Sequence, residues 1–150
     1  MSDHILKRHN KTLLLYHIVL PVKYRRKAIN EEVEHTIVSI SEEISLRYEI
    51  YFVEIGADEN HIHFLIQSVP TMSVEKIVRT IKSIMAKEIF KIHPEVKRIL
   101  WGGNFWTSGY YANTVGQYAN EEVIKRYLQS QGTEKEYKQF SKGQLKLFEI

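Results

Sequence analysis

The sequence predicts a single α+β domain in which helices pack on an antiparallel sheet. Short apolar runs rich in strand-forming residues alternate with segments whose apolar residues recur at helical spacing, and turn residues separate them. A length of 150 residues with 43% hydrophobic and 26% charged residues suits one buried core and excludes disordered and fibrous classes. We therefore expect residues 1–150 to form one domain.

The first third of the chain predicts a strand followed by a helix. Residues 12–20 are too few for a core helix and rich in strand formers, and Pro21 ends the run. Asn30 is expected to cap a helix that reaches about Tyr48, because glutamates fill its first turn, where the helix dipole favours negative charge. The apolar positions of this helix are expected at Val33, Ile37, Ile40 and Ile44.

The middle of the chain predicts a hairpin and a second helix. Two strand-like runs, 49–55 and 61–69, are separated by a turn-rich link and are expected to pair. The helix that follows is expected to be capped by Thr71 or Ser73 and to stop near His93, because a proline comes next. Its core positions are expected at Ile77, Ile81, Ile84 or Met85, and Ile89.

The last part of the chain predicts one more strand, 105–112, and one more helix, 120–131. The complete order is strand, helix, strand, strand, helix, strand, helix. This is the βαββαβ pattern of a ferredoxin-like, or RRM-like, sandwich with an antiparallel sheet, extended by a C-terminal helix. The polar tail 132–150 has sparse apolar residues, so we expect it to be loosely docked or to bind a partner.

The composition also excludes several kinds of protein. With no cysteine, the chain has no disulfides and no thiolate metal site, which leaves histidine and oxygen ligands. No apolar run approaches the roughly 18 residues that a membrane span needs. The start of the chain lacks the apolar core of a signal peptide, so we expect a cytoplasmic protein without a membrane partner.

Charge is unevenly distributed along the chain, although the net charge is only +3. Residues 1–27 carry a net charge of +6 and residues 28–60 a net charge of −8. The turn Lys23, Tyr24, Arg25, Arg26 and Lys27 is expected to bind DNA phosphates and to stack its tyrosine on a base; a solvated loop is the alternative. Arg79 and Lys82 share one side of the second helix with Lys76. This side is expected either to contact DNA or to be an ordinary solvent-exposed basic face. Five aromatic residues offer either base stacking or, as we favour, core packing: Trp101, Phe105, Trp106, Tyr110 and Tyr111.

His61 and His63 are the first candidates for chemistry. On a strand, residues two apart face the same side, so the two imidazoles should stand side by side while Ile62 and Phe64 face the other way. Paired neutral imidazoles form half of a site for a divalent metal. The alternative is a strand that carries two polar residues on a wet face.

Tyr127 and Gln131 are the second candidates, because residues four apart share one face of a helix. A phenol becomes an effective nucleophile when a metal or a cation stabilises the phenolate. The amide oxygen of Gln131 could be a third ligand and favours Mg²⁺ or Mn²⁺. The alternative is a half-buried tyrosine in the core.

Several segments resemble the insertion-sequence-200/605 transposases, the single-tyrosine HUH enzymes named for their His-hydrophobic-His motif. The resemblance covers about residues 10 to 131 in the family's order and spacing. The segments that carry it are 16–19, 23–27, 61–65, 105–116 and 123–131.

The resemblance implies a DNA strand-transfer enzyme. His61 and His63 would bind a divalent metal, Mg²⁺ or Mn²⁺, with Gln131 as third ligand. Tyr127 would attack single-stranded DNA next to a hairpin at the element end, leaving a 5′-phosphotyrosine and a free 3′-OH. The metal would polarise the scissile phosphate.

Excision requires two cleaved ends to be held at once, while each chain offers one His pair and one candidate tyrosine. A homodimer is the smallest solution. Two alternatives remain at this point: a domesticated relative that processes palindromes, and a catalytically silent hairpin-binding module in which His61, His63 and Tyr127 are structural. A rolling-circle replication nickase would also use an HUH motif, but the match across the whole chain favours the transposase.

Overall fold

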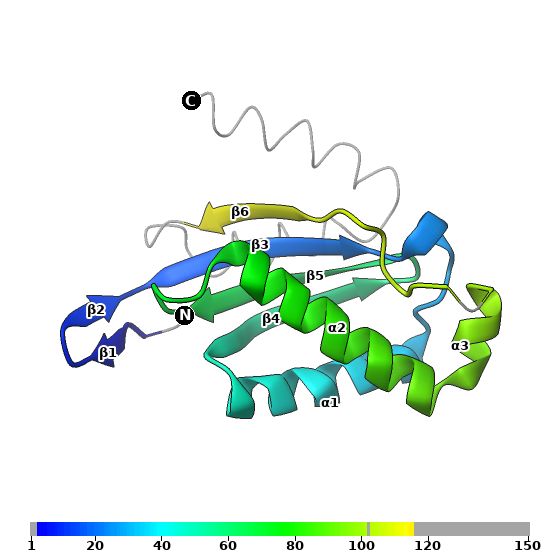
Figure 1. Ribbon diagram of the computed structural model, residues 1–150, viewed down its shortest axis with the longest axis horizontal. Coiled ribbons are helices and arrows are strands. Elements are labelled where there is room, and N and C mark those ends of the chain that lie inside the picture. Colours follow the sequence, from blue (N-terminus) through cyan, green and yellow to red (C-terminus); the bar gives the residue numbers. More distant parts are fainter. Residues whose placement is uncertain (1–2, 102, 116–150) are drawn as a thin grey trace, which may run out of the picture.

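The structure, a computed structural model, describes residues 3–101 and 103–115. Its main sheet is antiparallel, with four strands in the order β4-β5-β3-β6 (Figure 1). These strands are β3 (Leu14–Pro21), β4 (Ile50–Asp58), β5 (His61–Ser68) and β6 (Tyr111–Val115). The first and third strands of the βαββαβ unit are central, so the predicted ferredoxin-like class is confirmed. The predicted helix at 120–131 and the tail at 132–150 lie outside the described residues.

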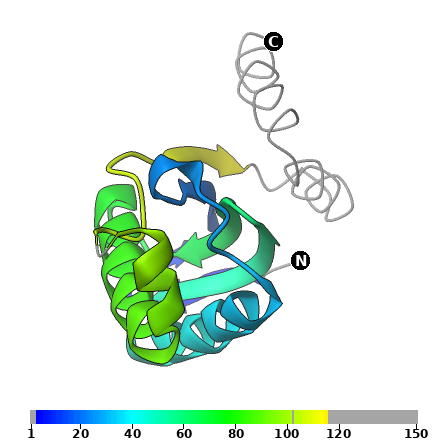
Figure 2. The same ribbon diagram turned by 90° about the vertical axis from the view of Figure 1, so that its right-hand side faces the viewer.

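Two helices, α1 (Glu31–Arg47) and α2 (Val74–Ile92), cover the same face of this sheet (Figure 2). The core lies between them and the strands, because alternate residues of β3 and β5 point at the helices. All predicted apolar positions of the helices are buried there, with Met85 rather than Ile84 at the ambiguous one. The sheet contributes Ile18, Leu20, Ile62, Phe64 and Ile66.

Each of these helices begins at a side-chain cap. The Oδ1 atom of Asn30 accepts a hydrogen bond of 2.8 Å from the backbone N–H of Val33, and Oγ of Ser73 accepts one of 3.1 Å from Lys76. Both caps satisfy a first-turn N–H that has no partner within the helix. The prediction for Asn30 is confirmed, and Ser73 rather than Thr71 caps the second helix.

The hairpin formed by β4 and β5 is confirmed, but its turn is tighter than the sequence predicted. Strand pairing continues to Asp58 and His61, so Gly56 lies inside β4 opposite His63 rather than in the link. The extra length is accommodated by a β-bulge between Phe52 and Glu54. The turn-forming residues of the link suggested a loop. The local sequence does not show that three of them pair with β5.

The predicted fourth strand is present, but its predicted bounds, 105–112, are wrong, since β6 runs from Tyr111 to Val115. Phe105 and Trp106 are buried against the core, and Trp106 forms only an isolated bridge with Val22. Backbone carbonyls after them need no strand partner, because Nζ of Lys82 donates hydrogen bonds to the oxygens of Thr107 and Gly109 at 2.8 and 2.9 Å. Aromatic spacing therefore marked a core segment rather than a strand.

Three short elements were not predicted: the hairpin β1 (Ile5–Lys7) and β2 (Asn10–Thr12), the 3-10 turn η1 (Lys23–Arg25), and α3 (Pro94–Ile99). Pro94 starts α3, because proline is tolerated in the first turn of a helix. Within the described ranges, we find no helix with the length and apolarity to span a membrane.

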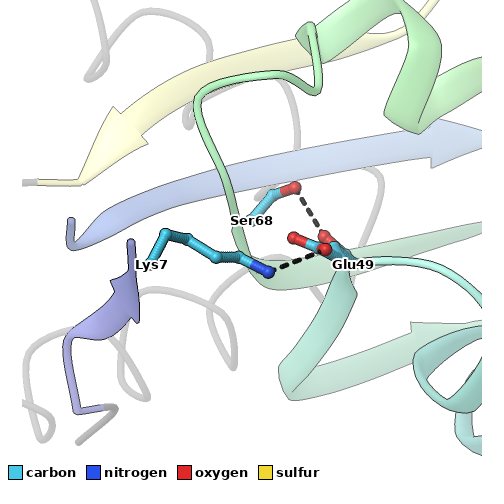
Figure 3. A network of polar contacts seen from close by, with 3 residues as sticks. All are labelled: Lys7, Glu49 and Ser68. Carbon is cyan, nitrogen blue, oxygen red and sulfur yellow. Dashed lines mark hydrogen bonds and ion pairs between the residues drawn. The ribbon is translucent and has the colours of Figure 1, made fainter. Parts of the chain in front are cut away.

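The β1-β2 hairpin is joined to the domain through Glu49, at the start of the β4 edge (Figure 3). Nζ of Lys7 donates a 2.8 Å hydrogen bond to the carboxylate of Glu49. The hydroxyl of Ser68, at the end of β5, donates a 2.6 Å bond to the backbone oxygen of the same residue. One residue thus links the hairpin to two strands of the main sheet.

Candidate active site on the histidine face

The face of the sheet opposite α1 and α2 carries the paired histidines. In β5, Ile62 and Phe64 point into the helix-covered core, so His61 and His63 point the other way. The two imidazoles lie side by side, with ring centroids 5.9 Å apart. Both side chains are buried. The placement expected from strand alternation is therefore present.

Gly56 gives the imidazole of His63 the space that it occupies. A Cβ atom at position 56 would lie only 2.7 Å from Nδ1 of His63 and closer still to its Cε1. The two residues are cross-strand partners, so the ring lies over the backbone of β4. Any side chain at position 56 would displace the ring. Sequence reasoning missed this residue because a glycine among turn-forming residues resembles a loop.

A hydrogen bond orients the ring of His61. Its Nδ1 atom lies 2.8 Å from Oδ1 of Asn60. Since an amide oxygen only accepts, Nδ1 carries the proton and donates it, which leaves the lone pair on Nε2. Histidine ligands of metals are usually fixed in this way through their second nitrogen. Asn60 is thus a supporting residue that the sequence analysis did not single out.

His63 is held in its neutral form. Burial, together with the potential positive charges of the neighbouring His17 and His61, lowers its pKa to about 3. Its buried Nδ1 has no hydrogen-bond partner among the described residues. Neutral imidazole is the form that ligates a metal, so His63 fits a divalent cation as a ligand.

His17, to which the sequence analysis gave no role, lies on the same face. Its ring centroid is 6.3 Å from that of His63, and burial lowers its pKa to about 4. The pairing of Val19 with His63 could have identified His17. Residue 17 lies two positions from Val19 on β3, so its side chain is on the same face of the sheet. Strand register depends on contacts distant in sequence, so the local pattern did not show it.

The histidine pair needs further ligands if it binds a metal. Within residues 3–101 and 103–115, no group of three or more His, Cys, Asp or Glu side chains could hold a metal ion. The predicted third ligand Gln131 and the predicted nucleophile Tyr127 both lie outside the described residues. The described residues accordingly contain the predicted histidine pair, and its role as a metal half-site stays a prediction.

The basic turn lies directly beside the His61 end of β5. The N–H of Val22 donates to the backbone oxygen of Asn60, and the N–H of Ile29 donates to that of Glu59, both at 2.9 Å. These bonds hold both ends of the segment 23–27 against the β4-β5 turn. The predicted phosphate-binding residues and the predicted metal ligands are therefore brought together.

The individual side chains of the turn differ in how they are placed. Tyr24 and Lys27 are exposed, and Lys27 lies 3.6 Å from the carboxylate of Glu59. Lys23, Arg25 and Arg26 are half-buried, with two guanidinium nitrogens of Arg25 and one of Arg26 buried. The guanidinium of Arg25 is therefore less accessible to solvent than an arginine in a fully solvated loop would be.

The stripe on α2 also divides into two kinds of residue. Arg79 is exposed and lies 3.8 Å from Glu75. Lys82 is bonded to two carbonyls of the 107–109 segment, and burial lowers its pKa. Between these residues and Trp106 lies an open pocket of about 520 Å³. Lys82 thus supports the structure of this loop, whatever contact it makes with DNA.

The fold and the site together define a class: a ferredoxin-like domain with paired histidines on one sheet face and a basic turn beside them. The family model described as "Transposase IS200 like" matches residues 10–131. The chain therefore belongs to the IS200-like transposase family, whose members are DNA-binding enzymes of insertion sequences. The resemblance inferred from the motifs is confirmed.

Individual relatives agree with this assignment. The chain is 29% identical to the ISDra2 transposase TnpA of Deinococcus radiodurans over 118 residues, 79% of this chain and 84% of the relative. It is 29% identical to the transposase for insertion sequence element IS200 of Salmonella typhimurium over 131 residues, 87% and 85% of the two chains. A crystal structure described as that of a candidate transposase from Deinococcus radiodurans R1 superimposes with a TM-score of 0.69 at 25% identity, covering 86% of this chain and 98% of that one.

Proposed function

We propose that this protein cleaves and rejoins single-stranded DNA at insertion-sequence ends through a covalent tyrosine intermediate, with a divalent metal as cofactor. The observation that carries the proposal is the pair of side-by-side imidazoles, His61 and His63, with His63 held neutral by burial. Burial of the His63 ring, whose Nδ1 has no hydrogen-bond partner among the described residues, costs free energy that folding alone does not explain. A metal held by these nitrogens would supply charge neutralisation at the scissile phosphate.

The residues of the chain divide the reaction between them. His61 and His63 would hold the metal with Gln131, whose amide oxygen would favour Mg²⁺ or Mn²⁺. The phenol oxygen of Tyr127 attacks the phosphorus and forms a phosphotyrosine on the 5′ side. The 3′ oxygen leaves and takes up a proton, while the phenol has lost one. A 3′-OH later attacks the phosphotyrosine, which restores the phenol, so one phosphodiester replaces another without an energy source.

The basic turn would bind the strand that enters this site. Lys23, Arg26 and Lys27 supply cations beside the end of β5 that carries His61, and phosphate contacts of this kind position DNA without reading its sequence. We propose DNA with hairpin ends as substrate and a homodimer as the working unit, since two ends must be held. A single mass corresponding to a monomer at working concentration would contradict the dimer.

A covalent-adduct assay tests the chemistry. The protein is mixed with a labelled oligonucleotide that carries a hairpin from the ends of the element and its single-stranded flank, with Mg²⁺ or Mn²⁺, and resolved on a denaturing gel. We expect an adduct that Tyr127→Phe abolishes while hairpin binding persists. His61→Ala and His63→Ala should also abolish it.

A matched histidine control separates site from fold. His35→Ala removes an exposed imidazole from α1 and should leave the adduct unchanged. An adduct that persists in Tyr127→Phe would overturn the nucleophile assignment. Hairpin binding without any adduct would favour the catalytically silent module.

A further inference from the structure

Backbone strain is concentrated at one corner of the described chain. Three non-glycine residues have positive φ angles: Tyr24 at 58°, Arg25 at 53° and Trp101 at 55°. The left-handed region is unfavourable for side chains with a Cβ, and two of the three are bulky aromatics. Strain of this kind persists where the surrounding structure imposes it, and it gathers at functional sites.

The two strained segments, distant in sequence, are in direct contact. The N–H of Lys23 donates a 2.9 Å hydrogen bond to the backbone oxygen of Phe105. The guanidinium of Arg26 lies over the ring of Trp101, 4.5 Å from its centroid, and Nζ of Lys23 lies 5.2 Å from the ring centroid of Tyr24. Two ring–cation pairs, Tyr24 with Lys23 and Trp101 with Arg26, therefore lie on adjoining segments, which we call the aromatic corner.

The aromatic corner gains little from packing. The side chain of Trp101 is 78% exposed and that of Tyr24 is 68% exposed, whereas Trp106, five residues further on, is 5% exposed. A large exposed ring in a strained backbone conformation stabilises neither the core nor the turn. Its exposed ring face is therefore available to a ligand.

Chemistry and position identify this ligand. Exposed aromatic faces flanked by cations bind unpaired nucleobases, which stack on the rings while the cations contact the backbone phosphates. The corner also adjoins the His61 end of β5, because Val22 donates to the backbone oxygen of Asn60. A strand bound here would lie beside the end of β5 that carries His61.

We propose that Tyr24, Arg26 and Trp101 form a stacking site for unpaired bases of the single-stranded DNA that enters the active site. This inference rests on the proposed function and adds the residues that distinguish single-stranded from paired DNA. It also explains why Phe105 and Trp106 are buried while Trp101 is not: Phe105 and Trp106 build the core and Trp101 meets the strand.

Binding of two DNA probes tests the site. We measure by fluorescence anisotropy the affinity for a labelled oligothymidylate and for a blunt, fully paired duplex. Trp101→Ala should weaken oligothymidylate binding about 5- to 100-fold, the range typical of losing one stacked base, and leave duplex binding unchanged. Trp101→Phe keeps an aromatic face and should retain most of the affinity. Equal losses for both probes, or none for oligothymidylate, would overturn the proposal.

A second exposed aromatic residue provides the matched control. Tyr48 also has an arginine over its ring, with Arg47 5.8 Å from the centroid, but it follows α1 in the acidic part of the chain. Tyr48→Ala should leave oligothymidylate binding unchanged. If it weakens binding as much as Trp101→Ala does, stacking at the corner is not specific and the proposal fails.

A glycine substitution separates binding from folding. Glycine adopts a positive φ without strain, so Trp101→Gly should keep or raise the thermal midpoint while weakening oligothymidylate binding. A lowered midpoint would show that Trp101 serves the fold and would overturn the proposal. A shift of the Trp101 variants to a smaller oligomer would also overturn the proposal, because the aromatic corner would then be an interface between copies of the chain.

Tryptophan emission supplies an independent readout, because Trp101 and Trp106 are the two tryptophans of the chain. Oligothymidylate should quench the emission of the wild type but not that of Trp101→Phe. If Trp101→Ala loses oligothymidylate binding and the wild type forms no adduct with any hairpin, the stacking site is supported and the proposed cleavage is not. A Tyr127-dependent adduct with normal strand binding in Trp101→Ala supports the cleavage and overturns the corner.

Discussion

The two faces of the central strand β5 are equally buried and chemically opposite. Phe64, 0% exposed, packs under α1 and α2, while its neighbour His63, 2% exposed, lies on the other face beside His17. Burying apolar rings stabilises the fold, whereas burying imidazoles costs free energy unless their nitrogens are used. The apolar residues under the helices therefore stabilise the fold, whereas the imidazoles of the histidine face are groups that folding does not require.

Substitutions at adjacent positions should separate the two faces most strongly. Phe64→Ala should lower the free energy of unfolding by about 3–5 kcal/mol, since it removes a buried ring and leaves a cavity. His63→Ala should lower it far less, because it also removes a buried nitrogen without a described hydrogen-bond partner. Urea denaturation of both variants measures this difference.

Activity should rank the same two variants in the opposite order. His63→Ala should reduce adduct formation by more than about 100-fold, since even a residue that only supports a metal ligand is typically worth 10–100-fold. Folded Phe64→Ala, assayed well below its denaturation midpoint, should retain most of its activity. Comparable activity losses in the two folded variants would show that the faces are not separate.

Gly56 tests whether the histidine face depends on the position of one ring. Gly56→Ala would insert a Cβ into the space of the His63 ring, so we expect adduct formation to fall sharply and stability to fall by about 1–3 kcal/mol from overpacking. Gly109→Ala is the control, because nothing lies within 4 Å of a Cβ there. Its stability and its adduct yield should match the wild type.

A double variant identifies the cause of this loss. In Gly56→Ala with His63→Ala the imidazole is absent, so the added methyl should no longer destabilise the protein. The stability of the double variant should therefore equal that of His63→Ala. A Gly56→Ala penalty that persists without the ring would mean that the glycine is needed for the β4 backbone itself.

The orientation of His61 should have a smaller effect than the position of His63. Asn60→Ala removes the acceptor for Nδ1 and should lower metal affinity and adduct formation by about 10–100-fold. Asn60→Asp keeps an oxygen acceptor and should restore most of both. Titration with Mn²⁺ followed by electron paramagnetic resonance measures the affinity separately from catalysis. Unchanged affinity in Asn60→Ala would remove Asn60 from the site.

The sequence predicted what depends on local pattern. Alternation in 61–68 gave the facing of His61 and His63, and cap chemistry gave the start of α1 at Asn30. It did not predict what depends on register: Gly56 opposite His63, and His17 on the neighbouring strand. Both relationships are set by pairing between distant segments, so one segment alone cannot show them.

Substitutions at the helix caps, on the helix-covered face, should have the smallest effect. Asn30→Ala and Ser73→Ala each remove a capping acceptor and should lower the free energy of unfolding by about 1 kcal/mol. Asn30→Asp keeps the acceptor and should be close to neutral. Because the caps lie on the helix layer, adduct formation by the folded variants should equal that of the wild type. An activity loss larger than the loss of folded protein would mean that the helices position the histidine face as well as support it, and the division between the two faces would then fail.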